Sequence, residues 1–154
     1  MKHRAGFTLI EIVVVVTIIA IVSTFSVSAW RGQVVKAEFD DAVLTILSVF
    51  QGARDYAISG VTVDDNMNSS YTVAFYNTAD SFSLDGDVSG LISSYSFDGI
   101  AGIDGEDWTA VYSSPYGECV TSTREDISFV VSSLKGGLNK TIVVHNLSGI
   151  AEIQ

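Results

Sequence analysis

One apolar segment constrains this chain more than any other feature of its sequence. It runs from Phe7 to Trp30 and contains a single charged side chain, Glu11. As a helix, residues 7–30 would span about 36 Å, enough to cross a membrane hydrocarbon core of about 30 Å. An isolated span must satisfy its backbone hydrogen bonds internally, which a helix does. The sequence therefore predicts a transmembrane helix over residues 7–30.

A short basic leader, residues 1–6, precedes this segment and ends at Gly6. A secretory signal has a shorter apolar region, roughly 7 to 15 residues, and is cut on its far side. A cut after Gly6 would instead remove the leader and keep the anchor. Because Lys2 and Arg4 lie before the span, we expect a cytoplasmic leader and an external C-terminal domain.

The order Gly6-Phe7-Thr8-Leu9-Ile10-Glu11 ahead of the apolar run resembles the class III signal of type IV prepilins and pseudopilins. The resemblance implies that prepilin peptidase cuts between Gly6 and Phe7 and that the new amine of Phe7 is N-methylated. It also implies four kinds of partner: other pilin or pseudopilin subunits, the peptidase, an inner-membrane assembly platform, and membrane lipid before assembly. The expected location is the bacterial inner membrane, followed by a periplasmic pseudopilus or a surface pilus.

Glu11 is the informative exception in the apolar segment. A charge in a membrane span costs a few kcal/mol on insertion scales, so it usually marks a function. The resemblance implies that Glu11 neutralises the free amine of Phe7 in an adjacent subunit. Two alternatives stay open. Phe7 and Glu11 are four residues apart and can pair within one helix, or a carboxylate at the helix start is simply stabilised by the helix dipole and reaches the interface.

The helix is expected to continue through residues 31–60 as an amphipathic segment. Apolar residues recur there every three or four positions in one stripe, whereas the charged residues lie off it. Gly60 is a stop signal, so the sequence predicts one helix over residues 8–59. The apolar stripe consists of Val35, Phe39, Val43, Ile46, Phe50, Ala53 and Ala57.

Residues 61–154 are predicted to form a β-rich domain, because short runs of strand-forming residues alternate with Gly, Asp, Asn and Ser. Residues 98–107 and 113–126 are expected to be loops. The fold class is α+β, with a long N-terminal helix packed on an antiparallel β-sheet, as in pilins. The expected strands cover residues 71–76, 82–84, 91–97, 108–112, 127–131, 141–145 and 150–153.

Two further stretches narrow the resemblance. Residues 52–60 are similar to the helix end of FimT/GspH-type proteins, and residues 142–153 to their closing strand pair. These proteins are minor pilins of type IV pili and H-type minor pseudopilins of type II secretion. Major type IV pilins commonly close a C-terminal loop with a disulfide, which the lone Cys119 does not allow. These similarities and the missing disulfide favour a minor subunit of the filament.

The charge balance excludes some partners. Without Lys2 and Arg4 the chain has 18 acidic and six basic residues, a formal net charge of −12. Such a surface repels phosphate backbones, so no nucleic-acid partner is expected. It also disfavours tight adsorption to anionic lipid.

No catalytic motif accompanies these features, and we expect a protein that is not an enzyme. His145 is the only histidine after the leader, and neither it nor Cys119 lies in a zinc-binding, phosphate-binding or nucleophile motif. The alternatives to a filament subunit are a single-pass anchored binding domain that does not polymerise and, less simply, a membrane-tethered enzyme.

Acidic turns raise calcium as a candidate ligand, with no other cofactor expected. Carboxylates in turns suit a hard cation, but their spacing here does not match an EF-hand. Solvated acidic loops are the simpler expectation. The candidate residues are Asp85, Asp87, Asp98, Asp104, Glu106 and Asp107.

Overall fold

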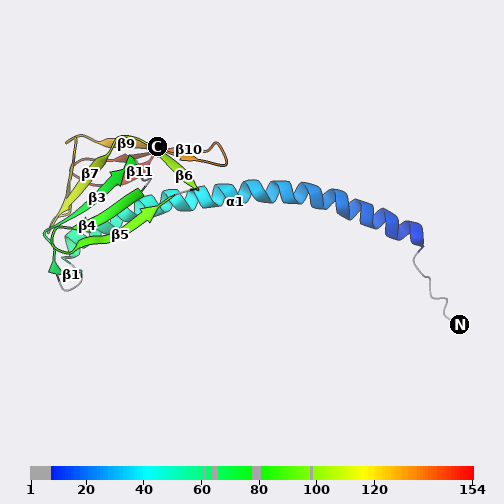
Figure 1. Ribbon diagram of the computed structural model, residues 1–154, viewed down its shortest axis with the longest axis horizontal. Helices are drawn as coiled ribbons and strands as arrows, with labels where there is room; N and C mark the ends of the chain where they lie inside the picture. Colours follow the sequence, from blue (N-terminus) through cyan, green and yellow to red (C-terminus); the bar gives the residue numbers. More distant parts are fainter. Residues whose placement is uncertain (1–7, 61, 64–65, 78–80, 98) are drawn as a thin grey trace.

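The computed structural model describes residues 8–60, 62–63, 66–77, 81–97 and 99–154. It shows one long helix, α1 (Leu9–Ser59), whose C-terminal half packs on β-strands and whose N-terminal half projects away from them (Figure 1). At 51 residues, α1 is roughly 75 Å long. The predicted α+β fold, a long N-terminal helix on antiparallel β-structure, is confirmed.

Both ends of α1 are set by local sequence signals. Thr8 is the N-cap, with extended backbone angles and a side chain that accepts a hydrogen bond from the Glu11 amide. Gly60 is in the left-handed conformation, and its amide donates to the Tyr56 carbonyl. The observed helix agrees with the prediction of residues 8–59 to within one residue.

The predicted stripe is the face of α1 that packs. Six of its seven members are buried, and only Val35, nearest the bare half, is half-exposed. At the centre of the core, the Phe50 ring lies 5.7 Å from the Trp108 ring and 6.2 Å from the Phe82 ring. Phe129 completes the cluster, with its ring 5.2 Å from that of Trp108. Burial of each such side chain stabilises the fold by about 1.5–3 kcal/mol.

The strands form two antiparallel sheets and a small hairpin. The five-stranded sheet has the order β5-β4-β3-β7-β8, and the four-stranded sheet has the order β11-β10-β9-β6. The hairpin pairs β1 (Thr62–Val63) with β2 (Asn66–Met67). The first sheet comprises β3 (Ser70–Tyr76), β4 (Ser81–Gly86), β5 (Gly90–Ser96), β7 (Trp108–Ser113) and β8 (Glu118–Thr121). The second comprises β6 (Ala101–Asp104), β9 (Ile127–Ser133), β10 (Asn139–Val144) and β11 (Ala151–Ile153).

The prediction that residues 98–107 and 113–126 are loops was wrong in part. The first segment contains β6, and the second contains β8. Both strands are four residues long and bury only two side chains, so the alternation is too short to read from sequence. They are strands because they pair with β9 and β7. The chain also forms two large sheets where a single one was expected, since β6 leaves its sequence neighbours and joins β9.

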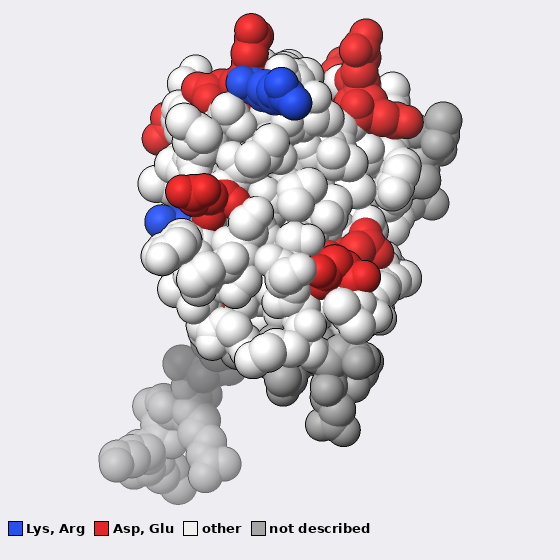
Figure 2. Space-filling view, turned by 90° about the vertical axis from the view of Figure 1, so that its left-hand side faces the viewer, with Lys and Arg blue, Asp and Glu red and all other residues white. Residues whose placement is uncertain are grey.

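The end of the domain that lies opposite the projecting helix is acidic. Figure 2 looks at this end and shows mainly Asp and Glu among its charged side chains. Acidic side chains therefore predominate among the charged groups on this face of the domain.

Candidate functional site

The N-terminal part of α1 is the most unusual surface of the protein. Every residue from 9 to 25 is exposed, and large apolar side chains predominate among them. We call residues 9–25 the bare half of α1. Soluble monomers rarely expose so large a continuous apolar surface, which marks contact with a membrane or another protein. The helix is long and apolar enough here to cross a membrane.

The two threonines inside the bare half are satisfied by their own helix. The Thr17 hydroxyl donates to the Val13 carbonyl at 2.8 Å, and the Thr24 hydroxyl donates to the Ala20 carbonyl at 2.9 Å. Such i to i−4 bonds remove the need for water around a hydroxyl group. Both threonines are therefore compatible with an apolar environment.

Glu11 is held at the helix start by Thr8. Its Oε2 atom accepts hydrogen bonds from the Thr8 amide at 2.8 Å and the Thr8 hydroxyl at 2.9 Å. The Glu11 amide in turn donates to Thr8 Oγ1 at 3.3 Å, which completes a capping box. Within the described residues, the second carboxylate oxygen, Oε1, has no hydrogen-bond donor. Glu11 therefore lies in the first turn of α1, the position that the helix-start alternative requires, while its role stays a prediction.

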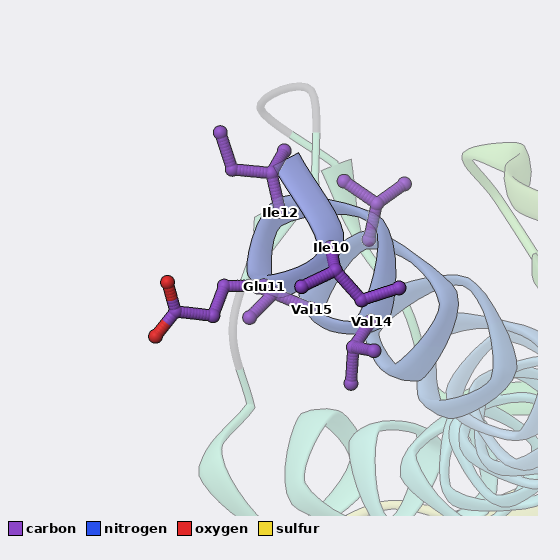
Figure 3. A pocket seen from close by; sticks show the side chains of 6 residues that line it. Ile10, Glu11, Ile12, Val14 and Val15 are labelled. Carbon is purple, nitrogen blue, oxygen red and sulfur yellow. The ribbon is translucent and has the colours of Figure 1, made fainter. Parts of the chain in front are cut away.

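The surface around Glu11 is apolar. Figure 3 shows its carboxylate pointing away from the helix, beside Ile10, Ile12, Val14 and Val15. The shallow hollow between these side chains is formed by a single helix, so it is open to lipid or to another helix and is not a ligand cavity. Among the described residues, the side chains that surround this carboxylate are apolar, and none of them can act as an acid or a base. Its available chemistry is that of a counter-ion for a positive group brought by a partner.

Gly6 and Phe7 lie outside the described residues. Cleavage between them, and the pairing of the Phe7 amine with Glu11 within a chain or between chains, therefore stay predictions. The structure does show that the predicted carboxylate stands at the first turn of an exposed helix.

The acidic candidates for calcium were expected in turns, but Asp85 lies in β4 and Asp104 lies at the end of β6, and the described candidates are not gathered at one point. Asp87 accepts hydrogen bonds from the Ser69 hydroxyl and amide, and the Ser69 hydroxyl is the main cause that lowers the pKa of Asp87. Asp85 accepts from the Ser83 hydroxyl at 2.7 Å, and Asp107 accepts from the Asn77 amide at 2.8 Å.

Asp104 and Glu106 are exposed, and Asp98 lies outside the described residues. Among the described residues, no group of three or more His, Cys, Asp or Glu side chains is arranged to hold a metal ion. Calcium binding stays a prediction.

Cys119 and His145 have separate environments. Cys119 is fully buried, and burial raises the pKa of its thiol to about 11, so the thiol is protonated at neutral pH. His145 places Nε2 3.1 Å from Glu152 Oε1 and Nδ1 2.8 Å from Asp126 Oδ2. Hydrogen bonds to Glu152 and then Asp126 raise the pKa of His145. The imidazole therefore bonds to two carboxylates and connects β11, which carries Glu152, with the segment before β9, which carries Asp126.

One contact was missed by the sequence analysis. The turn between β9 and β10 meets α1 just beyond the membrane-length segment, where a Cβ atom on Gly136 would lie 3.0 Å from Val35 Cγ1. No local pattern announces this contact, because it depends on the packing of residues far apart in the chain.

Comparison with known proteins gives one match. Residues 1–27 match the family model described as the prokaryotic N-terminal methylation motif. The match covers the leader, Gly6, Phe7, Glu11 and the bare half. No curated protein and no solved structure matches the chain.

Proposed function

We propose that this chain, which carries the N-terminal methylation motif of type IV pilins and pseudopilins, is a minor pilin or minor pseudopilin that joins a filament through α1. The observation that carries the proposal is the combination of this motif with a helix whose residues 9–25 are all exposed. A helix this apolar needs lipid or other protein around it. A subunit that moves from a membrane into a helical filament has both in turn.

In the proposed sequence of events, the precursor is first held in the inner membrane by residues 7–30, with its domain on the extracytoplasmic side. Prepilin peptidase cuts after Gly6, and the amine of Phe7 is methylated. The assembly platform then brings subunits together, so that packing between bare halves replaces contact with lipid. Helix association in a membrane is driven by such packing and by polar contacts between helices.

Glu11 is proposed to select the docking position. Thr8 occupies Oε2, which orients the carboxylate at the helix tip and satisfies part of its hydrogen-bonding capacity in lipid. Oε1 is proposed to accept from the Phe7 amine of a neighbouring subunit. That amine exists only after cleavage, so processing would create the partner charge. Charge pairing in an apolar environment is most effective as a device for register.

The cleavage step is tested by intact-mass measurement on protein extracted from membranes that contain the peptidase. We expect the native chain to lack residues 1–6 and to carry one added methyl group on Phe7. A Gly6→Val variant should stay at full precursor mass. A native chain that keeps its leader and never sediments with filaments would contradict the proposal and favour an anchored binding domain that does not polymerise.

The role of Glu11 is tested with two substitutions that separate charge from capping. Gln can replace Glu in a capping box, so Glu11→Gln keeps the helix start and removes the charge, whereas Glu11→Ala removes both. We expect both variants to be cleaved and both to be depleted from filaments. Asp41→Asn, at an exposed carboxylate of the same helix, is the matched control. Normal incorporation of Glu11→Gln would show that capping, and not charge pairing, is the role of Glu11.

The minor subtype rests on the similarity of residues 52–60 and 142–153 to FimT/GspH-type proteins. It is supported by the single cysteine, which cannot form the intramolecular disulfide common in major pilins. Relative abundance in purified filaments tests it, since a minor subunit should be far scarcer than the main filament protein.

A further inference from the structure

Basic side chains gather at the end of the domain nearest the bare half. Arg31 and Lys36 on α1 and Lys135 in the β9–β10 turn line one hollow of about 360 Å³, together with Val35 and Leu138. These are three of the six basic residues that follow the leader. The two segments that form the hollow lie within residues 12–37 and 127–151, neither of which contains an acidic residue. A locally positive site therefore stands out from a strongly acidic protein.

The hollow lies close to the expected membrane surface. The β9–β10 hairpin extends along α1 in the direction of the bare half (Figure 1), and its tip reaches the helix at Val35. Val35 is five residues beyond Trp30, which corresponds to about 7.5 Å of helix rise. The headgroup layer on each side of a bilayer is about 5–8 Å thick. With residues 7–30 across the bilayer, the hollow therefore lies at the level of the lipid phosphates.

The side chains next to the hollow suit an interface. Trp30 is 72% exposed, and Leu134, at the tip of the hairpin, is 62% exposed. Tryptophan is enriched at membrane interfaces, where its ring bridges apolar and polar layers. Lysine and arginine stems can lie along apolar surface while their charged ends reach polar groups. Val35 and Leu138, which line the hollow itself, place apolar side chains beside the cations.

The three cations are not neutralised by salt bridges within the described residues. The nearest carboxylates along α1 are Glu38, which is exposed and has no salt bridge within the described residues, and Asp40, which is bonded to Lys140 at 2.8 Å. Lys36 adds a weaker attraction that contributes to the lowered pKa of Asp40. The acidic end of the domain faces away from the bare half (Figure 2). The charge distribution thus favours one orientation of the domain on a negatively charged membrane.

We infer that this hollow binds the phosphate of an anionic lipid headgroup while the chain is anchored in the membrane, before assembly. The inference rests on the proposed membrane insertion of residues 7–30. It also refines the expectation from net charge, because the acidic domain repels an anionic membrane as a whole but presents its cations to it locally. Each cation at such a surface strengthens binding by a factor of about five.

Native mass spectrometry of the full chain in detergent, with equal amounts of phosphatidylglycerol and phosphatidylcholine, tests the inference. We expect phosphatidylglycerol adducts to predominate and Lys135→Gln to lower that preference about fivefold. Arg124→Gln is the matched control. It removes one exposed positive charge from the loop before β9, at the opposite end of that strand from Lys135. The control should retain the native preference.

Several results would overturn the inference. Equal binding of the two lipids by the native chain would do so, as would equal loss in both variants, which would indicate net charge alone. Complete displacement of the lipid by millimolar inorganic phosphate at constant ionic strength would show a site for free phosphate. Absence of lipid preference together with loss of Lys135→Gln from filaments would assign the hollow to contact between subunits.

The proposed function is tested separately in the same preparations by measuring cleavage of the leader. Lys135→Gln leaves the leader unchanged, so it should be cut after Gly6 at the native rate. A chain that is never cut would count against the filament proposal and leave the measured lipid preference standing.

Discussion

The two halves of α1 share one continuous backbone but differ in how apolar side chains are distributed around it. In the bare half, residues 9–25, apolar side chains point in all directions and every position is exposed. In the packed half, residues 39–57, they form one stripe that is buried against the strands, with charged residues outside it. The comparison shows that the angular distribution of apolar side chains, more than their number, indicates whether a helix segment is stabilised by its own domain or by a separate partner.

The largest expected difference between the halves is in the stability of the domain. Phe50→Ala would remove the helix ring from the aromatic cluster of Phe82 and Trp108 and should lower the free energy of unfolding by about 3–5 kcal/mol. Phe25→Ala, at a side chain that is 74% exposed in the bare half, should leave it unchanged. Urea unfolding in detergent, followed by near-UV circular dichroism, measures both. Equal shifts would show that the halves are not energetically independent.

A second test concerns the turn that lies on the end of the packed half. Gly117, between β7 and β8, has a φ of +67°, and a Cβ atom there would lie 2.8 Å from Ile58 Cγ1. Gly117→Ala should lower stability by about 2 kcal/mol, partly from the left-handed backbone and partly from the overlap.

Gly137→Ala provides the control for that test. Gly137 has a φ of +61° and open space where a Cβ atom would be, so its substitution should lower stability by only about 1 kcal/mol. If the two variants unfolded at the same urea concentration, the contact between the turn and α1 would contribute nothing.

A smaller effect of opposite sign is expected at the helical glycines. Gly52, in the packed half, and Gly32, between the halves, both have open space where a Cβ would be. Gly52→Ala should raise domain stability by about 0.5–1 kcal/mol, because alanine favours the helix that folds with the domain. Gly32→Ala should leave urea unfolding of the domain unchanged. A rise in stability in both variants would show that the helix around Gly32 unfolds together with the domain.

The smallest effect is expected from pH. Because Glu152 and Asp126 raise the pKa of His145 in the folded protein, the contribution of this link is fully present below the unfolded value of about 6.5. It is lost as the pH rises through the folded pKa.

NMR titration of the imidazole should therefore give a midpoint above 6.5. Stability should fall with rising pH in the native chain and fall less in His145→Gln. A midpoint below 6.5 would contradict the observed contacts.

The sequence was sufficient where the signal was local. Thr8 and Gly60 mark the helix ends by their own chemistry, and the three- and four-residue spacing of the stripe identifies the buried face. The four-residue strands β6 and β8 could not be predicted, because their pairing partners and not their side chains make them strands. Membership of two sheets likewise depends on which distant strand each one meets.

The same distinction holds for the candidate site. The order of Gly6, Phe7 and Glu11 is a contiguous pattern, and the methylation-motif match covers it. The Thr-x-x-Glu capping box is also contiguous and could have been predicted. The basic hollow could not, because Lys135 reaches Lys36 only through the hairpin that carries it.

Because α1 runs without a break from the bare half into the packed half, the direction in which the domain faces depends on the number of helix residues between them. Each residue of an α-helix advances the chain by about 100° around the axis. One residue inserted near Gly32 would swing the whole domain by about that angle relative to the rod, while lifting it by only about 1.5 Å. In a filament, such an insertion would present a different flank to every neighbour while leaving the contacts between the packed half of α1 and the strands in place.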